Sequence, residues 1–414
     1  MRNLFHFVLQ SAAVCCVLLL GACGFKAKSD GKSGDTIRYE HAELLTTVRY
    51  ADHVEVGIKN PWRKGELLDK YYLVRREDSV SFSNTSHKDG TTIVVPITRA
   101  IVGMSPLCQL MMWLGCQDKV CGVFDANYLN IPQMSKAISD GTVYDCGSSM
   151  SPNIEQVVQA RAQTAFLSAF EGSDNSKLTR TGCAVVECAE YMETSALGRA
   201  EWMKFYGMLF GREAEADALY NKVKANYTRI KTLAASATTR PTVLTERVTS
   251  GTWFCPGGKS TMANLIADAN GNYVFASDTH CGSLSLSPET VLDKAHAADV
   301  WLFIYSGEHP LSKADLLSEY HGYSQIKAFK NGGVFQCNNL KTPYFNEISF
   351  RPDFLLSDLV AIFHPELLAK KSKNNKEKNK NRESLSDKDA LNGKNTLGDN
   401  TPITSKHSLR YYEQ

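Results

Sequence analysis

The sequence predicts an α/β protein of two matched lobes, each with a mostly parallel central sheet, joined by a long α-helix. Short apolar segments rich in β-branched residues alternate with helical patterns along the chain, as in parallel sheets covered by helices. One long helical tract interrupts this alternation, which then restarts. Roughly 330 residues remain once the atypical chain ends are set aside, which is enough for two lobes of ordinary domain size.

The N-terminus has the pattern of a bacterial lipoprotein. Residues 1–22 combine Arg2 with an apolar run that is too short to span a bilayer as a permanent helix, which indicates a signal peptide. Small residues stand directly before Cys23, as in the lipobox at which a thiol is lipidated and the chain is cut. Residues 23–36 are the expected lipid anchor and flexible tether. The alternative is a plain secretory signal in which the cysteine is incidental.

The N-terminal lobe is predicted over residues 37–199. Its apolar segments are short enough for strands, and the segments between them have helical spacing. The expected elements are a strand over 93–102, a helix that follows loop 103–106 and ends at Leu114, strands over 119–124, 164–168 and 184–186, and a helix opened by Ser151-Pro152.

Connecting helices are predicted over 200–238 and a C-terminal lobe over 239–368. No proline interrupts residues 200–235, where one apolar side should lie on the body of the protein. That side is formed by Ala218, Leu219, Val223, Tyr227 and Ile230. The elements expected beyond it are a strand over 242–248, a loop over 249–258, a helix over 260–268, a helix opened by Ser287-Pro288 and a strand over 300–304.

Residues 369–414 form a basic tail. This segment holds 11 Lys and Arg against 6 Asp and Glu, with few apolar residues. No amphipathic period accompanies the charge, so a solvated, disordered extension is expected rather than a membrane-binding helix.

The two lobes repeat one another most clearly around two acidic residues. Glu155 follows Ser151-Pro152, Glu289 follows Ser287-Pro288, and paired aliphatic residues and a strand come after each. A serine N-cap with proline at the first helical position is expected to begin both helices. Taken alone, each glutamate would only complement the helix dipole, but the repeated register favours a shared role.

Short motifs spread over residues 37–368 support one family resemblance. They are Ser105-Pro106 before Leu114-Gly115, Val120-Cys121-Gly122-Val123, Ser151-Pro152-Asn153-Ile154-Glu155, Gly198-Arg199-Ala200-Glu201-Trp202 with Leu209-Phe210-Gly211, and Arg351-Pro352-Asp353 before His364-Pro365-Glu366-Leu367. In their order and spacing the chain resembles the helix-linked periplasmic binding proteins that serve importers of ferric siderophores, haem and cobalamin. The family's usual Lys-Pro-Asp after the first matched helix is replaced by Ala162-Gln163-Thr164.

The resemblance implies a function in transport. Such proteins are held at the membrane by lipid, face the periplasm, bind a metal chelate in a cleft between the lobes and deliver it to an ABC permease. It implies a monomer with no enzymatic activity, no catalytic residue, no cofactor and no nucleic-acid partner. Glu155 and Glu289 occupy the places of the acidic residues that dock on permease arginines, where charged pairing suits a reversible contact.

Ligand contacts are expected in loops at the carboxyl ends of strands, where open α/β sheets bind their ligands. One such loop holds Ser105, and another holds Trp253 and Phe254 among glycines. Aromatic faces pack well on macrocycles and catecholate rings, although loop packing would also explain these two residues. Further candidates are Tyr273, Tyr344, Phe345, Arg99 and Arg351, the last of which fits better as a brace for the final helix.

Binding of a bare metal ion receives little support from the sequence. His280 stands beside Cys281 with no second ligand at helical or strand spacing, and the nine cysteines beyond Cys23 include no CxxC pair. We therefore expect no metal site. The alternatives that remain open are a zinc or manganese binder of an importer, a cysteine-ligated metalloenzyme subunit, and a haemophore-like or adhesion module.

Overall fold

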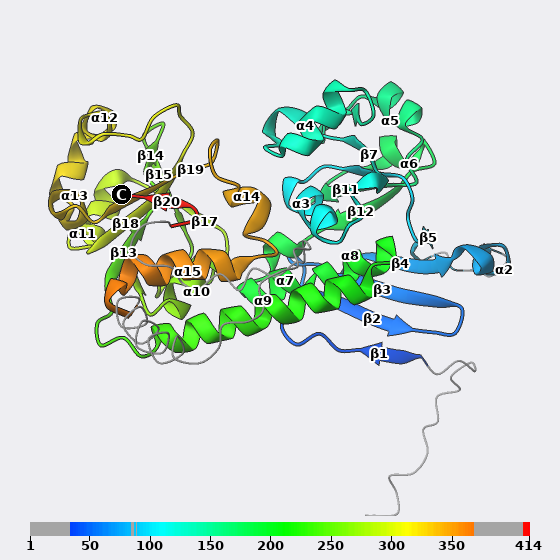
Figure 1. The fold of residues 1–414 in the computed structure, drawn as a ribbon, viewed down its shortest axis with the longest axis horizontal. Coiled ribbons are helices and arrows are strands. Elements are labelled where there is room, and N and C mark those ends of the chain that lie inside the picture. Colours follow the sequence, from blue (N-terminus) through cyan, green and yellow to red (C-terminus); the bar gives the residue numbers. More distant parts are fainter. Residues whose placement is uncertain (1–33, 84–86, 88, 368–408) are drawn as a thin grey trace, which may run out of the picture.

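The computed structural model describes residues 34–83, 87, 89–367 and 409–414. Two α/β lobes stand side by side over the long helix α9 (Glu213–Ala234) (Figure 1). The predicted two-lobed α/β fold with a connecting helix is therefore confirmed. The predicted signal peptide and Cys23 lie outside the described residues. Among the residues that are described, no helix is both long and apolar enough to cross a membrane.

The N-terminal lobe is built on a five-stranded parallel sheet in the order β12-β11-β6-β7-β8. Four of its strands consist entirely or almost entirely of buried residues, as expected where helices cover both faces of a parallel sheet. The strands are β6 (Ala100–Val102), β7 (Val120–Val123), β8 (Tyr144–Asp145), β11 (Thr164–Ser168) and β12 (Ala184–Cys188), and the helices are α3 (Ser105–Trp113), α4 (Pro132–Ser139), α5 (Ile154–Ala160) and α6 (Ser176–Thr179).

The N-terminal region also forms a second five-stranded sheet that sequence analysis missed, in the order β1-β2-β3-β4-β5. The predicted strand over 93–102 is wrong, because the chain leaves this sheet at Pro96 and enters the other at Ala100. Proline has no N–H for a strand ladder, so the break falls there. Residues 35 and 36, assigned to the tether, belong to β1. The bounds are β1 (Asp35–Ile37), β2 (Leu45–Arg49), β3 (His53–Lys59), β4 (Leu67–Arg75) and β5 (Thr91–Val95), with α2 (Ser79–Ser83) after β4.

Two buried carboxylates hold the segment between β1 and β2 against the body. Glu201 accepts hydrogen bonds from the backbone N–H groups of Glu40, His41 and Ala42 at 2.8–3.1 Å. Glu193 accepts others from Glu43 and Leu44, and from the indole of Trp202 at 2.9 Å. Buried charge is tolerated where its oxygens are paired in this way. The glutamate and tryptophan of the Gly198–Trp202 motif are therefore structural.

Helices α7 (Ala196–Glu201), α8 (Met203–Phe210) and α9 connect the lobes. Gly211, with a φ of 65°, ends α8 and lets the chain turn into α9. Val223, Tyr227 and Ile230 are buried, as predicted, whereas Ala218 is exposed because Tyr220 occupies the buried face instead. The final helix α15 (Pro352–Phe363) packs along α9 and completes the platform beneath both lobes (Figure 1).

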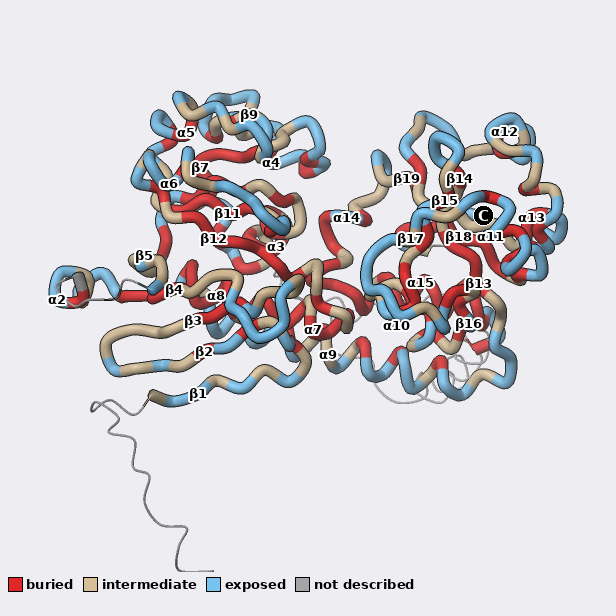
Figure 2. Tube along the Cα trace, turned by 180° about the vertical axis from the view of Figure 1, so that it is seen from behind, coloured by how far each residue is buried: buried red, intermediate tan, exposed pale blue. Residues whose placement is uncertain are grey.

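The C-terminal lobe repeats the first with a sheet in the order β16-β13-β18-β19-β20. Its first four strands are parallel, and β20 is antiparallel to β19. Many of the buried residues lie in the central strands of both lobes (Figure 2). The bounds are β13 (Thr242–Thr245), β16 (Asn272–Tyr273), β18 (Val300–Tyr305), β19 (Val334–Asn338) and β20 (Tyr412–Glu413), with α10 (Thr261–Asp268), α11 (Pro288–Ala295), α12 (Lys313–Glu319), α13 (Lys327–Asn331) and α14 (Tyr344–Glu347).

Two predictions for this lobe are wrong. The expected loop over 249–258 is mainly strand β15 (Thr252–Pro256), which pairs antiparallel with β14 (Val248–Thr249) and β17 (Ser283–Leu286). The tail over 369–414 is not disordered throughout, because residues 409–414 are folded onto the lobe and supply β20. The part of the tail before Leu409 lies outside the described residues.

The hydroxyl of Tyr71 links the N-terminal sheet to the sheet of the N-terminal lobe beside two carboxyl groups. The hydroxyl of Tyr71 in β4 donates to Asp69 and accepts a hydrogen bond from the backbone N–H of Glu187 in β12, both at 2.8 Å. One carboxylate oxygen of Glu187 accepts from Ser173 and Asn175, while the other is buried without a hydrogen-bond partner. An unsatisfied buried oxygen disfavours the ionised form.

Because of Glu187, the free energy of unfolding is expected to fall between about pH 4.5 and pH 7. Burial, and next the charge of Asp69, raises the pKa of Glu187 from 4.5 to about 7. The stabilising contribution of the protonated form is complete below the unfolded pKa and is lost as pH rises through the folded pKa. Glu187→Gln should raise the free energy of unfolding at pH 8 by about 1–2 kcal/mol, since water reaches part of the carboxyl. Urea unfolding at pH 5 and pH 8 measures this, and parallel pH profiles for the two proteins would contradict it.

Candidate functional site between the lobes

The carboxyl ends of the parallel strands in the two lobes lead into loops that meet between the lobes. Asn130, after β7, donates through its side-chain amide to the carbonyl of Leu340, after β19, at 3.0 Å. Asn346 of α14 donates to the carbonyl of Asn130 at 2.7 Å. Nearer to the connecting helices, Thr261 and Asn264 of α10 donate to the carbonyls of Glu193 and Thr194 at 2.9 and 2.8 Å. The two strand edges at which α/β sheets bind ligands therefore face one another.

Four large apolar side chains are exposed on these facing edges. Tyr128 follows β7 and is 86% exposed, and Phe170 follows β11 and is 49% exposed. Leu340 follows β19 and Phe345 lies on α14, and these are 56% and 48% exposed. Open α/β sheets bind their ligands at this end of their strands, so exposed apolar side chains here are candidates for ligand contacts. We call these four residues the interlobe apolar set.

Backbone strain lies at the same edges. Asp125, directly beyond β7 and Phe124, has a φ of 52°, and Glu246, directly after β13, has a φ of 61°. Residues other than glycine adopt this left-handed conformation at a cost, and such positions cluster at functional sites. The carboxylate of Asp125 is used locally, because it accepts the backbone N–H of Ser149 at 3.1 Å. Burial raises the pKa of Glu246 to about 7.

A partly buried cation lies at the base of this region. Burial lowers the pKa of the Arg199 guanidinium on α7 from its usual value, and the charge of Glu190 opposes this shift. The Nε atom of Arg199 is buried with no hydrogen-bond partner. Glu190 accepts the hydroxyl of Tyr206 at 3.0 Å, and burial raises the pKa of this carboxyl. A partly buried arginine with an unused donor is suited to an anionic group that enters between the lobes.

Of the predicted ligand contacts, Ser105 and Phe254 remain available to a ligand. Ser105 is the first residue of α3, at the carboxyl end of β6, and is partly exposed. Phe254 is 45% exposed on the face of β15 opposite Trp253. Both remain predictions, since nothing in their surroundings assigns them a ligand.

Trp253 and Tyr273 are wrong as ligand contacts in this structure. Trp253 is fully buried, with its indole N–H donating to the carbonyl of Thr245 at 3.1 Å and its ring against Trp301 and Tyr323. Tyr273 is 3% exposed and donates its hydroxyl to the carbonyl of Pro256 at 2.6 Å. In a strand, alternate side chains point to opposite faces, so the exposed Phe254 and the buried Trp253 follow from one register.

The predicted cations are also engaged elsewhere. Arg99 precedes β6, at the strand edge away from the other lobe, and donates twice to the carbonyl of Ala160 at the end of α5. This position does not support the predicted ligand contact of Arg99, which stays a prediction. Arg351 is buried, forms two hydrogen bonds of 2.9 Å with Asp353 and stacks 3.5 Å from the centre of the Phe354 ring. This confirms that Arg351 braces the last helix.

The candidate metal residues do not converge on one another. His280 pairs with Asp278 at 3.0 Å, and Cys281 is exposed. Over the ranges that the structure covers, nine cysteines are free, and no group of three or more His, Cys, Asp or Glu side chains could hold a metal ion.

Glu155 and Glu289 are exposed at the second helical position of α5 and α11. The predicted Ser-Pro start is confirmed for α11, where Ser287 caps the N–H of Thr290 at 3.2 Å. It is wrong for α5, because Ser151-Pro152 forms strand β10 and Asn153 is the cap. The two glutamates nevertheless keep the same helical register. The hydroxyl of Tyr320 interacts with Glu289, while Gln159 donates to Glu155 at 3.3 Å.

Sequence reasoning missed three members of the interlobe apolar set and Arg199 as candidate contacts. The signal for Arg199 was present, because the residue belongs to the Gly198–Trp202 motif. Tyr128, Phe170 and Leu340 each follow a strand directly or within a short turn, which was the rule applied to Ser105. Exposure could not be predicted for them individually, since it depends on where the opposite lobe stands.

Known proteins resemble this chain over most of its length. Residues 109–339 match the model of a family described as periplasmic binding protein. An uncharacterized lipoprotein of Methanocaldococcus jannaschii is 29% identical over 354 residues, which cover 79% of this chain and 82% of that protein. A periplasmic heme binding protein from Pseudomonas aeruginosa matches with a TM-score of 0.53 at 18% identity, covering 65% of this chain and 93% of that one.

A further solved structure comes from an ABC-type Fe3+-hydroxamate transport system of Saccharomonospora viridis. It matches with a TM-score of 0.52 at 16% identity and covers 65% of this chain and 94% of that chain. At such identities the two structures share the fold of this chain, including its paired lobes.

Proposed function

Because this chain belongs to the periplasmic binding protein family, we propose that it is the substrate-binding lipoprotein of an ABC importer and that it captures a metal chelate between its lobes. The observation that carries this proposal is the interlobe apolar set, four exposed apolar side chains on loops and a short helix that follow strands of both lobes. A binding site of this kind combines apolar walls with a few polar groups that orient the ligand. The protein's role is binding and delivery, not catalysis.

The chemistry of these residues favours a bulky, ring-bearing and anionic ligand. The aromatic side chains Tyr128, Phe170 and Phe345 suit the flat faces of a macrocycle or an aromatic iron ligand. Arg199 suits a carboxylate or another anionic group of the chelate. Haem, corrinoids and ferric siderophores combine these features to different degrees. The structural neighbours that bind heme or belong to Fe3+-hydroxamate transport support this class of ligand.

The main alternatives receive less support from the described residues. A free zinc or manganese ion needs three or four converging His, Asp, Glu or Cys ligands, and the described part of the chain offers no such group. A cysteine-ligated metal cluster needs thiolates. Burial raises the pKa of Cys146 and Cys183 to about 12, which disfavours thiolate formation at both.

Two exposed glutamates and the helices that connect the lobes support delivery of the ligand to a permease. Glu155 and Glu289 present one carboxylate per lobe in the same helical register, which suits docking on basic residues of a permease. The lobes share the α9 and α15 platform, so ligand capture should need only a small hinge movement. Lipidation at Cys23 would keep the protein at the membrane, facing the periplasm, beside the permease. A relative named a lipoprotein supports this arrangement.

Phe170→Ala and Phe345→Ala are each expected to weaken chelate binding by roughly 5- to 30-fold, because each removes an aromatic side chain that is about half exposed between the lobes. The measurement is equilibrium titration of residues 24–414 with haemin, cyanocobalamin and ferrichrome, following whichever probe binds most tightly. Leu67→Ala is the matched control, since Leu67 is 50% exposed on β4, in the sheet formed by β1 to β5. Unchanged affinity in both Phe170→Ala and Phe345→Ala, or an equal loss of affinity in Leu67→Ala, would place the ligand elsewhere.

A further inference from the structure

The extreme C-terminus returns to the C-terminal lobe, although residues 368–408 separate it from the last helix. Residues Leu409–Gln414, which we call the C-terminal strap, include β20 at the edge of the lobe's sheet (Figure 1). Cys337 and Gln336 of β19 pair with Tyr412 and Glu413 in an antiparallel register. The strap thus covers a strand edge that would otherwise carry unpaired backbone groups.

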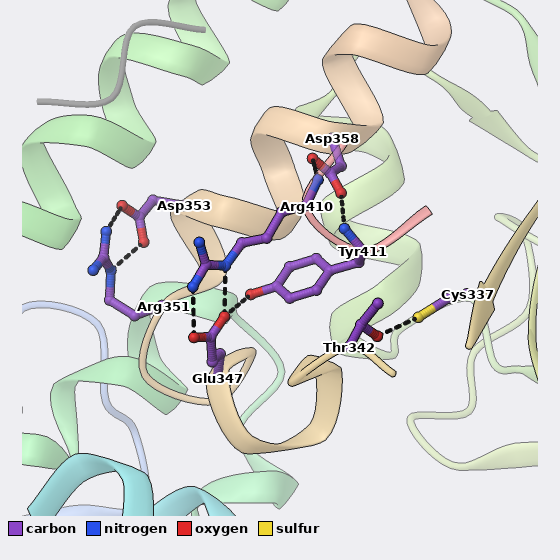
Figure 3. A network of polar contacts seen from close by, with 8 residues as sticks. All are labelled: Cys337, Thr342, Glu347, Arg351, Asp353, Asp358, Arg410 and Tyr411. Atoms are coloured by element: carbon purple, nitrogen blue, oxygen red, sulfur yellow. Dashed lines mark hydrogen bonds and ion pairs between the residues drawn. The ribbon is translucent and has the colours of Figure 1, made fainter. Parts of the chain in front are cut away.

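The strap grips α14 through charged hydrogen bonds. Glu347 at the end of α14 is 5% exposed and accepts both Nε and Nη2 of Arg410 at 2.6 Å. It also accepts the hydroxyl of Tyr411 at 2.8 Å. Figure 3 shows these three bonds converging on one carboxylate. A two-point arginine–carboxylate pair fixes orientation as well as distance.

A second carboxylate anchors the strap to the platform helix α15. Asp358 is 5% exposed and accepts the backbone N–H groups of Arg410 and Tyr411 at 2.9 and 2.7 Å (Figure 3). Tyr411 and Tyr412 are buried, and both rings meet the ring of Tyr344 edge-on. Tyr305 donates to Glu413 at 2.9 Å. The strap therefore bonds to α14 and α15 at once.

Helix α14 is the element that joins the strap to the region between the lobes. It carries Phe345 of the interlobe apolar set, and its Asn346 bonds to Asn130 of the opposite lobe. It also packs on α3, the helix that begins at Ser105. With only four residues, α14 has too few internal hydrogen bonds to hold its own position. Its placement must come from the groups that surround it.

We propose that the C-terminal strap positions α14 for ligand binding, so that the affinity of the interlobe site depends on the last six residues of the chain. This inference rests on the proposed function for the ligand, but not for the positioning of α14. Loss of the strap leaves the buried carboxylates of Glu347 and Asp358 without their partners. Each carboxylate then becomes hydrated or finds new partners, and α14 loses the three hydrogen bonds that fix Glu347.

The test compares the chain of residues 24–414 with a variant that lacks 409–414, using hydrogen exchange of the ligand-free proteins. Amides of residues 344–350 are expected to exchange at least about 10-fold faster in the truncated protein. Adding a synthetic peptide of residues 407–414 in excess should restore their protection. Helix α11 serves as the internal reference, since none of the strap's hydrogen bonds or ring contacts reaches it. Unchanged exchange at 344–350, or equal acceleration at α11, would overturn the proposal.

The ligand readout uses haemin, cyanocobalamin and ferrichrome as probes. Truncation and Arg410→Ala should each lower the affinity for the most tightly bound probe at least about 5-fold. Gln414→Ala, which removes one hydrogen bond to the carbonyl of Gly332, should leave this affinity unchanged. Arg410→Lys keeps the charge but loses the two-point geometry, so its affinity should lie between those of Arg410→Ala and Gln414→Ala. Truncation that speeds exchange at α14 but leaves affinity intact overturns the link to binding. If no probe binds the intact chain, the proposed function fails while the exchange result still decides the positioning role.

Discussion

A chain that carries both Glu155→Arg and Glu289→Arg is expected to bind its ligand normally and to deliver almost none of it to the permease. Both side chains are exposed, so their reversal leaves the core and the interlobe region intact. Each reversal replaces an attractive charge pair by a repulsive one, and disrupting one close charge pair at an interface typically costs about 2–5 kcal/mol. Transport of labelled ligand in cells should therefore fall at least ~30-fold in the double variant.

The control for this experiment is Asp293→Arg, an exposed charge reversal on the same helix as Glu289. Import should fall much less than in the double variant, because Asp293 is a neighbour of Glu289 on α11 but does not occupy the matched position. Single variants of Glu155 and Glu289 should show intermediate losses of import. Their loss of affinity for the permease should be smaller at high salt, because salt screens the interaction between exposed charges. Full import by the double variant would remove the docking role from both residues.

Trp253→Ala is expected to lower the free energy of unfolding by about 3–5 kcal/mol, the range for large aromatic side chains removed from a core. The indole is fully buried against Trp301 and Tyr323, and its N–H satisfies the carbonyl of Thr245. Urea unfolding measures the change. Trp253→Phe keeps most of the volume and should cost only about 1–2 kcal/mol, for one lost hydrogen bond and reduced packing.

The phenylalanine variant also separates a structural from a binding role for this position. We expect its affinity for the tightest of the three chelate probes to stay within about twofold of the unchanged protein. A strong loss of affinity in a stable Trp253→Phe protein would show that the residue reaches the ligand after all.

The two-lobed fold was predictable because strong local patterns specify it. The buried strands β7 and β11 are short and mainly apolar, and α9 shows a clear helical period free of proline. The sheet β1–β5 was missed because strands such as β1 and β3 carry many partly exposed residues, which blur the period-two signal. The run from Ile93 to Val102 concealed a change of sheet that only Pro96 marks.

The sequence predicted which loops lie between the lobes, but not which of their side chains are exposed there. Loops at the carboxyl ends of strands do lie between the lobes, yet which side chains are exposed there depends on packing across the sheet and between the lobes. Trp253 illustrates this, because glycines at 251, 257 and 258 indicate a loop whereas Trp253 and Cys255 alternate with Phe254 as in a strand. Arg410 could not be connected to Glu347 from sequence, since their pairing joins segments separated by a long polar stretch.

The most direct test of the central claim is a titration of residues 24–414 with haemin, cyanocobalamin and ferrichrome, with zinc ion as the comparison ligand. The proposed function predicts saturable one-to-one binding of at least one chelate, with a Kd at or below about 1 μM, and no such binding of zinc. Saturation by zinc alone, or by none of the four ligands, would contradict the capture of a metal chelate between the lobes.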